Sequence, residues 1–343
     1  MRAASAATVL GSAACCFVVG QLLLALSMET WRPEWRDPEL GARLRQLRRL
    51  TQEKGPPAWL VLGSSRVQRA FAPEVLAADQ EAWGYNFGLT AAGPVREYLA
   101  LRRLLADGIR PGRLLVEVLP ARLRQEPGAA EIDTLAGARL CRSDLRDLEA
   151  LLGTSPPHLR RAWLEARLLP AWSARFSLMN WFAPAWLPWG IRQEGWYEID
   201  LGWMPFYDPP GPGLSQQHQL EQTRAEYLPA LRAFRITADA DRALRAVLEL
   251  GQSAGTAPAL LLMPESAEFR SWYRAESLRE IDAYLTDLER EFGVEVIDCR
   301  EWMADSDFTD GHHLTRAGAR RFGERFAREV LPRLLSGRTA AAQ

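Results

Sequence analysis

Short apolar segments alternate with helical segments over much of this chain, and this alternation restricts its fold more than any other feature. The apolar segments are almost free of polar residues, which is typical of strands buried on both faces of a parallel sheet. Strands are expected at 58–62, 114–119, 259–263 and 294–297, and a further short strand is expected to end in Tyr85-Asn86-Phe87. The sequence therefore predicts an α/β fold with a five-stranded parallel sheet covered by helices.

Amphipathic helices are expected between these strands. One has Pro94 near its first position and Gly108 at its end, which is the usual placement of proline and glycine in helices. Others are expected over 237–251, around Ile281 and Leu285, and over 315–332. Residues 56–120 and 236–335 are thus predicted to form one α/β domain, followed by a disordered Ala-rich tail at 336–343.

The third and fourth strands are separated by far more chain than one crossover helix needs, so an insertion is predicted at 121–235. Its first part, 140–170, is charged and helical, and its second part, 171–215, is rich in tryptophan. Two compatible interpretations are a lid subdomain with its own aromatic core, and a platform for acyl chains, sugar rings or the bilayer interface. Six of the 13 tryptophans lie there: Trp172, Trp181, Trp186, Trp189, Trp196 and Trp203.

Residues 3–27 carry no charge, and only Gln21 among them is strongly polar. A run of 25 such residues is long enough to cross a membrane as a helix. The segment 1–28 is predicted to be a transmembrane anchor, and the alternative is a secretory signal cleaved near Ala25-Leu26-Ser27. Both interpretations place the body outside the cytoplasm, and 29–55 is predicted to be an amphipathic juxtamembrane helix.

The charge balance excludes the basic surface of a nucleic-acid-binding protein, because 42 Lys and Arg residues face 43 Asp and Glu residues. The apolar content of 48% and the charged content of 25% are those of a globular protein. The four cysteines form neither a disulfide framework nor a zinc-ligand pattern. No metal or cofactor is expected.

Polar motifs follow three of the predicted strands, where open parallel sheets carry their sites. Gly63-Ser64-Ser65 follows the first strand, and such a turn can project a serine hydroxyl beside backbone N–H groups that receive an oxyanion. Asn86-Phe87-Gly88 ends the second strand. Its glycine either brings an N–H close to a reacting carbonyl or serves a turn.

The third motif is Asp310-Gly311-His312-His313, directly before the last predicted helix. An acid three residues before a histidine can hold the imidazole in the tautomer that accepts a serine proton. A calcium loop is excluded, because Arg316 stands where such a loop needs glutamate. The chain therefore offers a serine, a base and an orienting acid.

These motifs, in this order, resemble blocks I, II and V of the SGNH/GDSL hydrolases. The resemblance implies a flavodoxin-like three-layer sandwich. It also implies that Ser65 is the nucleophile, His313 the general base and Asp310 its orienter. The amides of Ser65 and Gly88, with Asn86 of the same block, are implied as the oxyanion and substrate site.

Two positions depart from the family pattern. Ser64 replaces the usual block I aspartate, as in the membrane-anchored branch similar to the DltD and alginate O-acetylation proteins. Glu117 lies where block III would supply Gly-x-Asn. It is interpreted as a buried structural acid, a partner of Arg66 or part of the site.

The resemblance implies an exported serine esterase or O-acyltransferase acting on acyl esters of a cell-surface polysaccharide or envelope polymer. The implied partners are that polymer and a membrane-bound O-acyltransferase. The alternative, favoured by the altered block III, is a non-catalytic scaffold that binds polymer or the acyltransferase. A third interpretation is a secreted lipase whose Trp-rich lid opens at lipid.

Overall fold

The computed structural model describes residues 6–77, 82–123, 131–154, 156–188, 200–204, 215–232 and 234–336. The chain forms two compact units. The first unit comprises Met1–Ala42 and Leu135–Glu198, and the second unit comprises Arg43–Thr134 and Ile199–Gln343. The predicted insertion is thus divided between the two units. The predicted tail beyond residue 336 and the tryptophans Trp189 and Trp196 lie outside the described residues.

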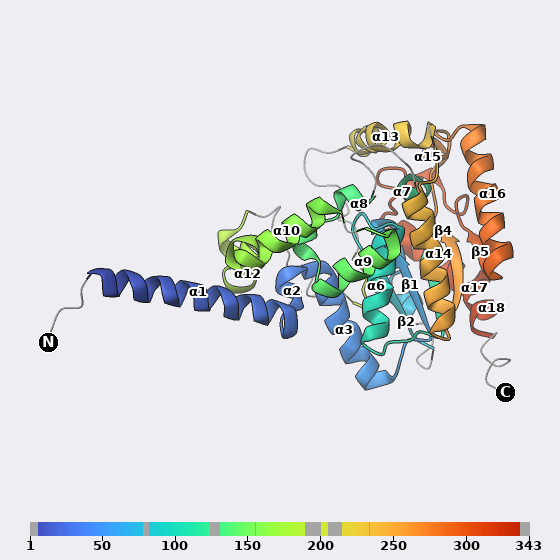
Figure 1. Cartoon of the computed structure of the whole chain (residues 1–343). Helices are drawn as coiled ribbons and strands as arrows, with labels where there is room; N and C mark the ends of the chain where they lie inside the picture. The colour runs from blue at the N-terminus through green and yellow to red at the C-terminus, as the bar shows by residue number, and fades with distance from the viewer. Residues whose placement is uncertain are drawn as a thin grey trace. The chain divides into compact units, whose positions relative to one another are not determined.

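The second unit contains a five-stranded sheet in which every neighbouring pair is parallel (Figure 1). The strand order is β2-β1-β3-β4-β5, the order of flavodoxin-like sheets. This confirms the predicted fold class. The strands are β1 (Trp59–Gly63), β2 (Gly84–Gly88), β3 (Arg113–Glu117), β4 (Ala257–Leu262) and β5 (Glu295–Asp298).

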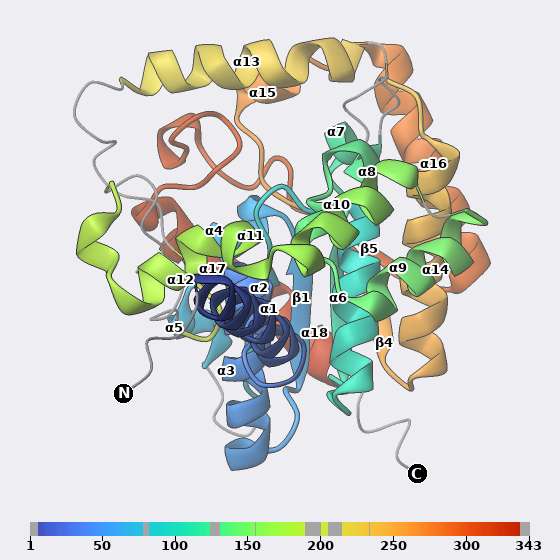
Figure 2. The ribbon, with the colours of Figure 1, turned by 60° about the vertical axis from the view of Figure 1, so that its left-hand side comes forward.

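Helices cover both faces of the sheet (Figures 1 and 2). One face carries α6 (Pro94–Ala106), α14 (Ala238–Ser253) and α16 (Ala275–Phe292), and the other carries α4 (Ser65–Ala70), α5 (Pro73–Leu76) and α17 (Arg316–Glu329). The remaining helices of this unit in its described residues are α7 (Pro120–Leu123), α8 (Glu131–Thr134), α13 (Gln216–Arg232), α15 (Ala267–Arg270), η5 (Asp305–Asp307) and α18 (Leu331–Ser336). Helix α3 (Pro38–Lys54) begins in the first unit and continues into this one.

Aromatic rings fill the core between β1 and α17. The Trp59 ring lies 5.9 Å from Phe71 and 6.1 Å from Phe326, and all three side chains are almost fully buried. The last predicted helix, 315–332, is in fact two helices that meet at Val330. Pro332 explains the break, because proline lacks the N–H that would continue the helical hydrogen bonds and its ring clashes with the carbonyl four residues earlier, at Arg328 in the last turn of α17.

The first unit is helical in its described residues. Its longest helix, α1 (Ala6–Thr30), is long and apolar enough to cross a membrane by length and composition. A second group of helices supplies the predicted helical segment between β3 and β4. The other elements are α2 (Pro33–Arg36), η1 (Gly137–Arg139), α9 (Arg142–Leu152), α10 (Pro157–Leu168), α11 (Pro170–Ser173), α12 (Arg175–Phe182) and η2 (Pro184–Trp186).

Candidate active site

Ser65, His313 and Asp310 form a continuous hydrogen-bonded chain in the second unit. Ser65 is the first residue of α4, directly after β1, and its Oγ lies 2.8 Å from His313 Nε2. On the other side of the imidazole, Nδ1 lies 2.7 Å from Asp310 Oδ2. The structure thus brings together the three side chains that the sequence singled out, although Ser65 and His313 are 248 positions apart.

The turn that presents Ser65 is tightly packed. A Cβ on Gly63 would lie 2.4 Å from Val67 Cγ2 and 2.6 Å from Glu117 Oε2, so only glycine fits there. Ser64 is the N-cap of α4, and its Oγ accepts a hydrogen bond from the Arg66 N–H at 3.1 Å, as serine commonly does at this position. These contacts fix the start of α4 and hence the position of Ser65.

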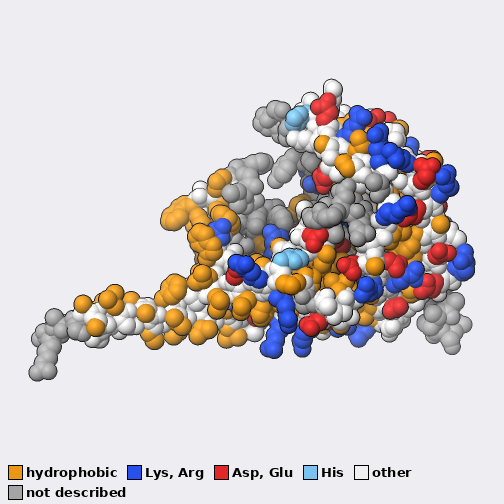
Figure 3. Space-filling model, turned by 45° about the horizontal axis from the view of Figure 1, so that its top comes forward, with side chains coloured by type: hydrophobic (Ala, Val, Ile, Leu, Met, Phe, Trp, Pro, Cys, Tyr) orange, Lys and Arg blue, Asp and Glu red, His pale blue; other side chains and the backbone are white. Residues whose placement is uncertain are grey.

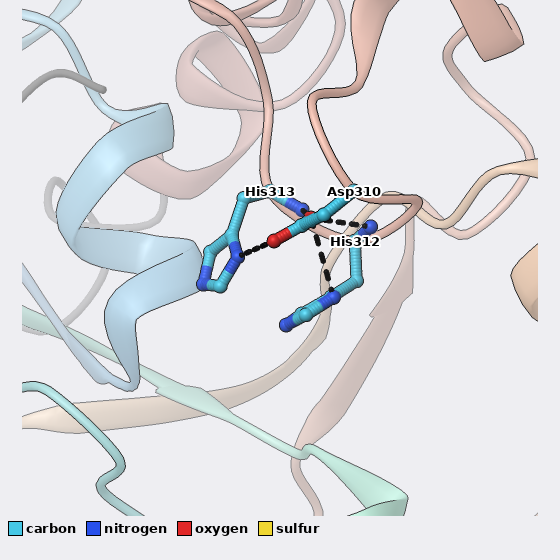
Figure 4. Close-up of side chains that lie close together, drawn as sticks. All are labelled: Asp310, His312 and His313. Atoms are coloured by element: carbon cyan, nitrogen blue, oxygen red, sulfur yellow. Dashed lines mark hydrogen bonds and ion pairs between the residues drawn. The ribbon is translucent and has the colours of Figure 1, made fainter. Parts of the chain in front are cut away.

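In the loop before α17, hydrogen bonds to Asp310 fix the position of the His313 imidazole (Figure 4). The backbone N–H groups of His313 and His312 donate to Asp310 Oδ1 at 2.9 and 3.2 Å. Gly311, between Asp310 and His312, has a φ of 93°, in the left-handed region that favours glycine. Asp310 therefore orients His313 through both its backbone and its side chain.

The charges of the site favour a neutral imidazole that accepts a proton. Burial lowers the pKa of His313 below its ordinary value, and Arg69 adds to this while Asp310 opposes it. Burial would raise the pKa of Asp310, but the neighbouring imidazoles and the hydrogen bonds from His313 outweigh it and hold that pKa well below its usual value. An ionised Asp310 accepts the Nδ1–H, which leaves Nε2 as the acceptor for the Ser65 hydroxyl.

Exposure differs along this chain of residues. Ser65 and His313 are partly exposed, whereas Asp310 and His312 are buried. The His312 ring packs 5.0 Å from Tyr227 and 5.4 Å from Phe269. The serine and the imidazole therefore lie nearer the protein surface than the acid behind them.

Asn86 and Gly88 bond to each other and to α4 in this structure. The buried Asn86 Nδ2 donates to the carbonyl oxygens of Val67, Gln68 and Phe71, at 2.8 to 3.3 Å. Its Oδ1 accepts the Gly88 N–H at 3.0 Å. The Gly88 amide, predicted to be an oxyanion donor, is thus engaged inside the protein, and Asn86 ties β2 to the helix that carries Ser65.

Glu117 lies directly beneath the serine turn. Its Oε2 accepts the Ser64 N–H at 2.5 Å, and its Oε1 lies 3.7 Å from Arg66 Nε. Two of the three interpretations of Glu117, a buried structural acid and a partner of Arg66, therefore describe the same arrangement.

Glu265 is a second buried acid beside Arg66, and it was not predicted from the sequence. Its Oε1 lies 3.4 Å from Arg66 Nη2 and accepts the Tyr273 hydroxyl at 2.9 Å. Arg66 Nη2 also donates to the carbonyls of Met263 and Pro264, at the end of β4. The signal for Glu265 was its position just after a predicted strand, where the other site residues also lie.

Asp310, His312 and His313 are also the described residues that could hold a metal ion, since their ligand atoms lie within 4.8 Å of one another. The pair Asp310 Oδ2 and His313 Nδ1 is only 2.7 Å apart. Two ligands of a tetrahedral zinc, with bonds of about 2.0–2.1 Å, lie roughly 3.3 Å apart. The observed spacing therefore suits a hydrogen bond better than joint metal ligation.

Comparisons with known proteins add distant structural likenesses. No protein-family model matches this chain, and no curated protein matches it. The chain is similar to a Bacteroides fragilis protein provisionally described as an acylhydrolase, with 9% identity and a TM-score of 0.40 over 85% of this chain and 98% of that one. It is also similar to a Streptococcus pneumonia protein provisionally described as a platelet activating factor, with 12% identity and a TM-score of 0.33 over 86% and 94% of the two chains.

Proposed function

We propose that this protein is a serine esterase or O-acyltransferase that forms an acyl-enzyme at Ser65. The observation that carries the proposal is the hydrogen-bonded chain from Ser65 Oγ through His313 to Asp310. As Oγ attacks the acyl carbonyl, His313 Nε2 takes the hydroxyl proton and then gives it to the departing alcohol. Water or a sugar hydroxyl next attacks the Ser65 ester, with His313 again as the base, and releases the acid or the new ester.

The developing oxyanion needs donors that face the reacting carbonyl. The Ser65 N–H is suited to this role, because it belongs to the first turn of α4, whose N–H groups have no partner within the helix. The Gly88 N–H would have to leave Asn86 Oδ1 to join it. We therefore expect slow hydrolysis of small substrates, because a small substrate does not move the Gly88 N–H away from Asn86 Oδ1.

We further propose that the body is exported and held at the membrane by α1, and that its substrates are acyl esters of a cell-surface polysaccharide or envelope polymer. The support is the 25-residue apolar helix ahead of the catalytic unit. A reporter that is active only outside the cytoplasm, fused after Arg36, is expected to be active. Activity of a cytoplasmic reporter at the same junction would contradict export.

The second candidate is a non-catalytic scaffold that binds such a polymer or a membrane-bound O-acyltransferase. Two observations favour it: the Gly88 N–H is engaged, and Glu117, where a block III donor is expected, faces Ser64 and Arg66. A scaffold would bind polymer equally well with and without the Ser65 hydroxyl.

Hydrolysis separates the two candidates. Full-length protein in detergent is assayed with p-nitrophenyl acetate and with an O-acetylated polysaccharide, beside Ser65→Ala and the control Ser271→Ala, an exposed serine of the same unit. The proposal expects Ser65→Ala to lose about 10³-fold or more of the activity and the control to retain it. No hydrolysis by the wild type, with polymer binding intact in Ser65→Ala, would favour the scaffold.

A further inference from the structure

The first unit exposes large apolar side chains on the helices from α10 to η2. Trp172 is 67% exposed, Phe182 70% and Trp186 79%. Leu168 and Leu169, at the end of α10, are 65% and 49% exposed. Figure 3 shows hydrophobic side chains along α1 and over neighbouring helices of this unit. Large apolar side chains that gather in this way on a protein surface mark an interaction site.

These helices are attached to the apolar helix α1 itself. The Ala171 N–H, in α11, donates to Gln21 Oε1 at 3.2 Å. Gln21 is the strongly polar residue of the uncharged run. The hydrocarbon core of a membrane offers no hydrogen-bond donor to its side chain, and the Ala171 N–H supplies one. Arg167, at the end of α10, pairs with Glu29 near the end of α1, and Arg36 pairs with the same carboxylate at 2.7 Å. The two attachments hold α10 and α11 along the C-terminal part of α1.

The position of Gln21 gives the depth of this attachment. At 1.5 Å per residue, Gln21 lies roughly 12 Å along the helix from Glu29, the first charged residue after the apolar run. A hydrocarbon core about 30 Å thick takes about 20 residues of helix. If Ser27 marks its edge, Gln21 lies about 9 Å inside it. Interfacial helices bury their apolar faces by about 5–10 Å, so α11 lies at the depth of such a helix.

The chemistry of the surface is also that of a membrane interface. Tryptophan and arginine are enriched where the apolar core meets the headgroups. The Arg175 guanidinium lies 4.2 Å from the Trp172 ring and 4.4 Å from the Phe176 ring. Arg32, just after α1, lies 5.4 Å from the Trp181 ring. Aromatic rings and cations thus occur together beside the end of α1.

We propose that the exposed face of α10 to η2 is embedded in the lipid bilayer, in the same leaflet as the C-terminal end of α1. The first unit then holds the membrane by a spanning helix and by an interfacial group of helices docked on it. This assigns the exposed tryptophans of the insertion to lipid. The inference rests on α1 spanning the membrane and is independent of the chemistry at Ser65.

Depth-dependent fluorescence quenching tests it in the full chain. Cys15, Cys16 and Cys141 are changed to Ala, while the buried Cys299 stays. A single cysteine is then placed at Trp172 or Trp186 and labelled with an environment-sensitive fluorophore. The matched control is Glu149→Cys, on an exposed position of α9 in the same unit. A variant that retains Cys15 reports on α1, and thermal melts check the fold of each variant.

The proteins are reconstituted in vesicles of phosphatidylcholine and phosphatidylglycerol with doxyl-labelled lipid. The proposal expects labels at positions 15, 172 and 186 to be quenched by the lipid probe and protected from iodide, and the label at position 149 to show the reverse. Iodide access at 172 and 186 equal to that at 149 would overturn it, as would an unquenched label at 15. Protection at 172 and 186 that requires a high protein-to-lipid ratio and shows no lipid quenching would instead indicate a second copy of the chain.

Discussion

Glu117 accepts the Ser64 N–H through a buried hydrogen bond of 2.5 Å, and this contact joins the end of β3 to the turn that presents Ser65. The same carboxylate lies 3.7 Å from Arg66. Arg66 in turn binds the end of β4 through Met263 and Pro264. The carboxyl ends of two neighbouring strands, β3 and β4, therefore fix the turn that carries Ser65.

Removal of the Glu117 carboxylate should destabilise the protein and disturb Ser65. Glu117→Ala leaves the Ser64 N–H and the Arg66 guanidinium without this buried partner, and loss of one member of a buried ion pair typically costs about 3–5 kcal/mol. Glu117→Gln retains an acceptor and should lose less. Denaturant unfolding measures both, with Glu324→Ala, an exposed acid of α17, as the control. Equal stability of Glu117→Ala and the wild type would show that the cluster does not support the turn.

Asn86→Ala should cost stability, because Asn86 binds three carbonyl groups of the α4 region and the Gly88 N–H. An unfolding free energy lower by about 2–3 kcal/mol is expected when such buried groups lose their partner. An oxyanion donor would behave differently. If Asn86→Ala leaves the stability unchanged and lowers kcat by about 10²- to 10³-fold, Asn86 acts in the oxyanion site.

The sheet could be predicted from the sequence because its central strands β1, β3 and β4 are built on short apolar runs that are almost fully buried, whereas β5 at one edge has exposed acidic ends. The convergence of Ser65 with Asp310 and His313 follows from the same topology, since the carboxyl ends of parallel strands meet at one edge.

Side-chain partners between distant segments could not be predicted in this way. The Gly88 N–H donates to Asn86 Oδ1 because of the position that the Asn86 side chain adopts. Hydrophobic periodicity does not predict such a position. Glu265 meets Arg66 across 199 positions of sequence. The Asn86 N–H at the sheet edge pairs with Leu201, from the segment that the sequence analysis placed in an insertion. Each contact depends on tertiary packing rather than on local pattern.

The pH dependence of the reaction should follow the protonation of His313. Burial holds the pKa of its imidazole below the ordinary value of about 6.5, so the base stays neutral and the rate stays level until the pH falls below that value. Arg69 lowers the same pKa, so Arg69→Gln should move the acid limb to higher pH. Rate profiles of ester hydrolysis show this, with Arg320→Gln as the control. A limb that moves to lower pH in Arg69→Gln would contradict the electrostatic account.

Chelation should leave the activity unchanged. The close pair Asp310 Oδ2 and His313 Nδ1 suits a hydrogen bond, and the proposed reaction uses only side-chain and backbone groups of the protein. Dialysis against EDTA, followed by assay with and without added zinc, measures the effect. Loss of activity that zinc restores would instead make Asp310, His312 and His313 a metal site.

Covalent labelling of the full-length protein shows whether Ser65 is a nucleophile activated by His313. A fluorophosphonate probe should attach to Ser65, located by peptide mass spectrometry. Ser65→Ala should abolish labelling, and His313→Ala should reduce it about as much, because members of a triad act as a unit. Ser64→Ala should only weaken it, because Ser64 caps α4. Labelling that survives Ser65→Ala, or a folded wild-type protein that is not labelled, would contradict the account.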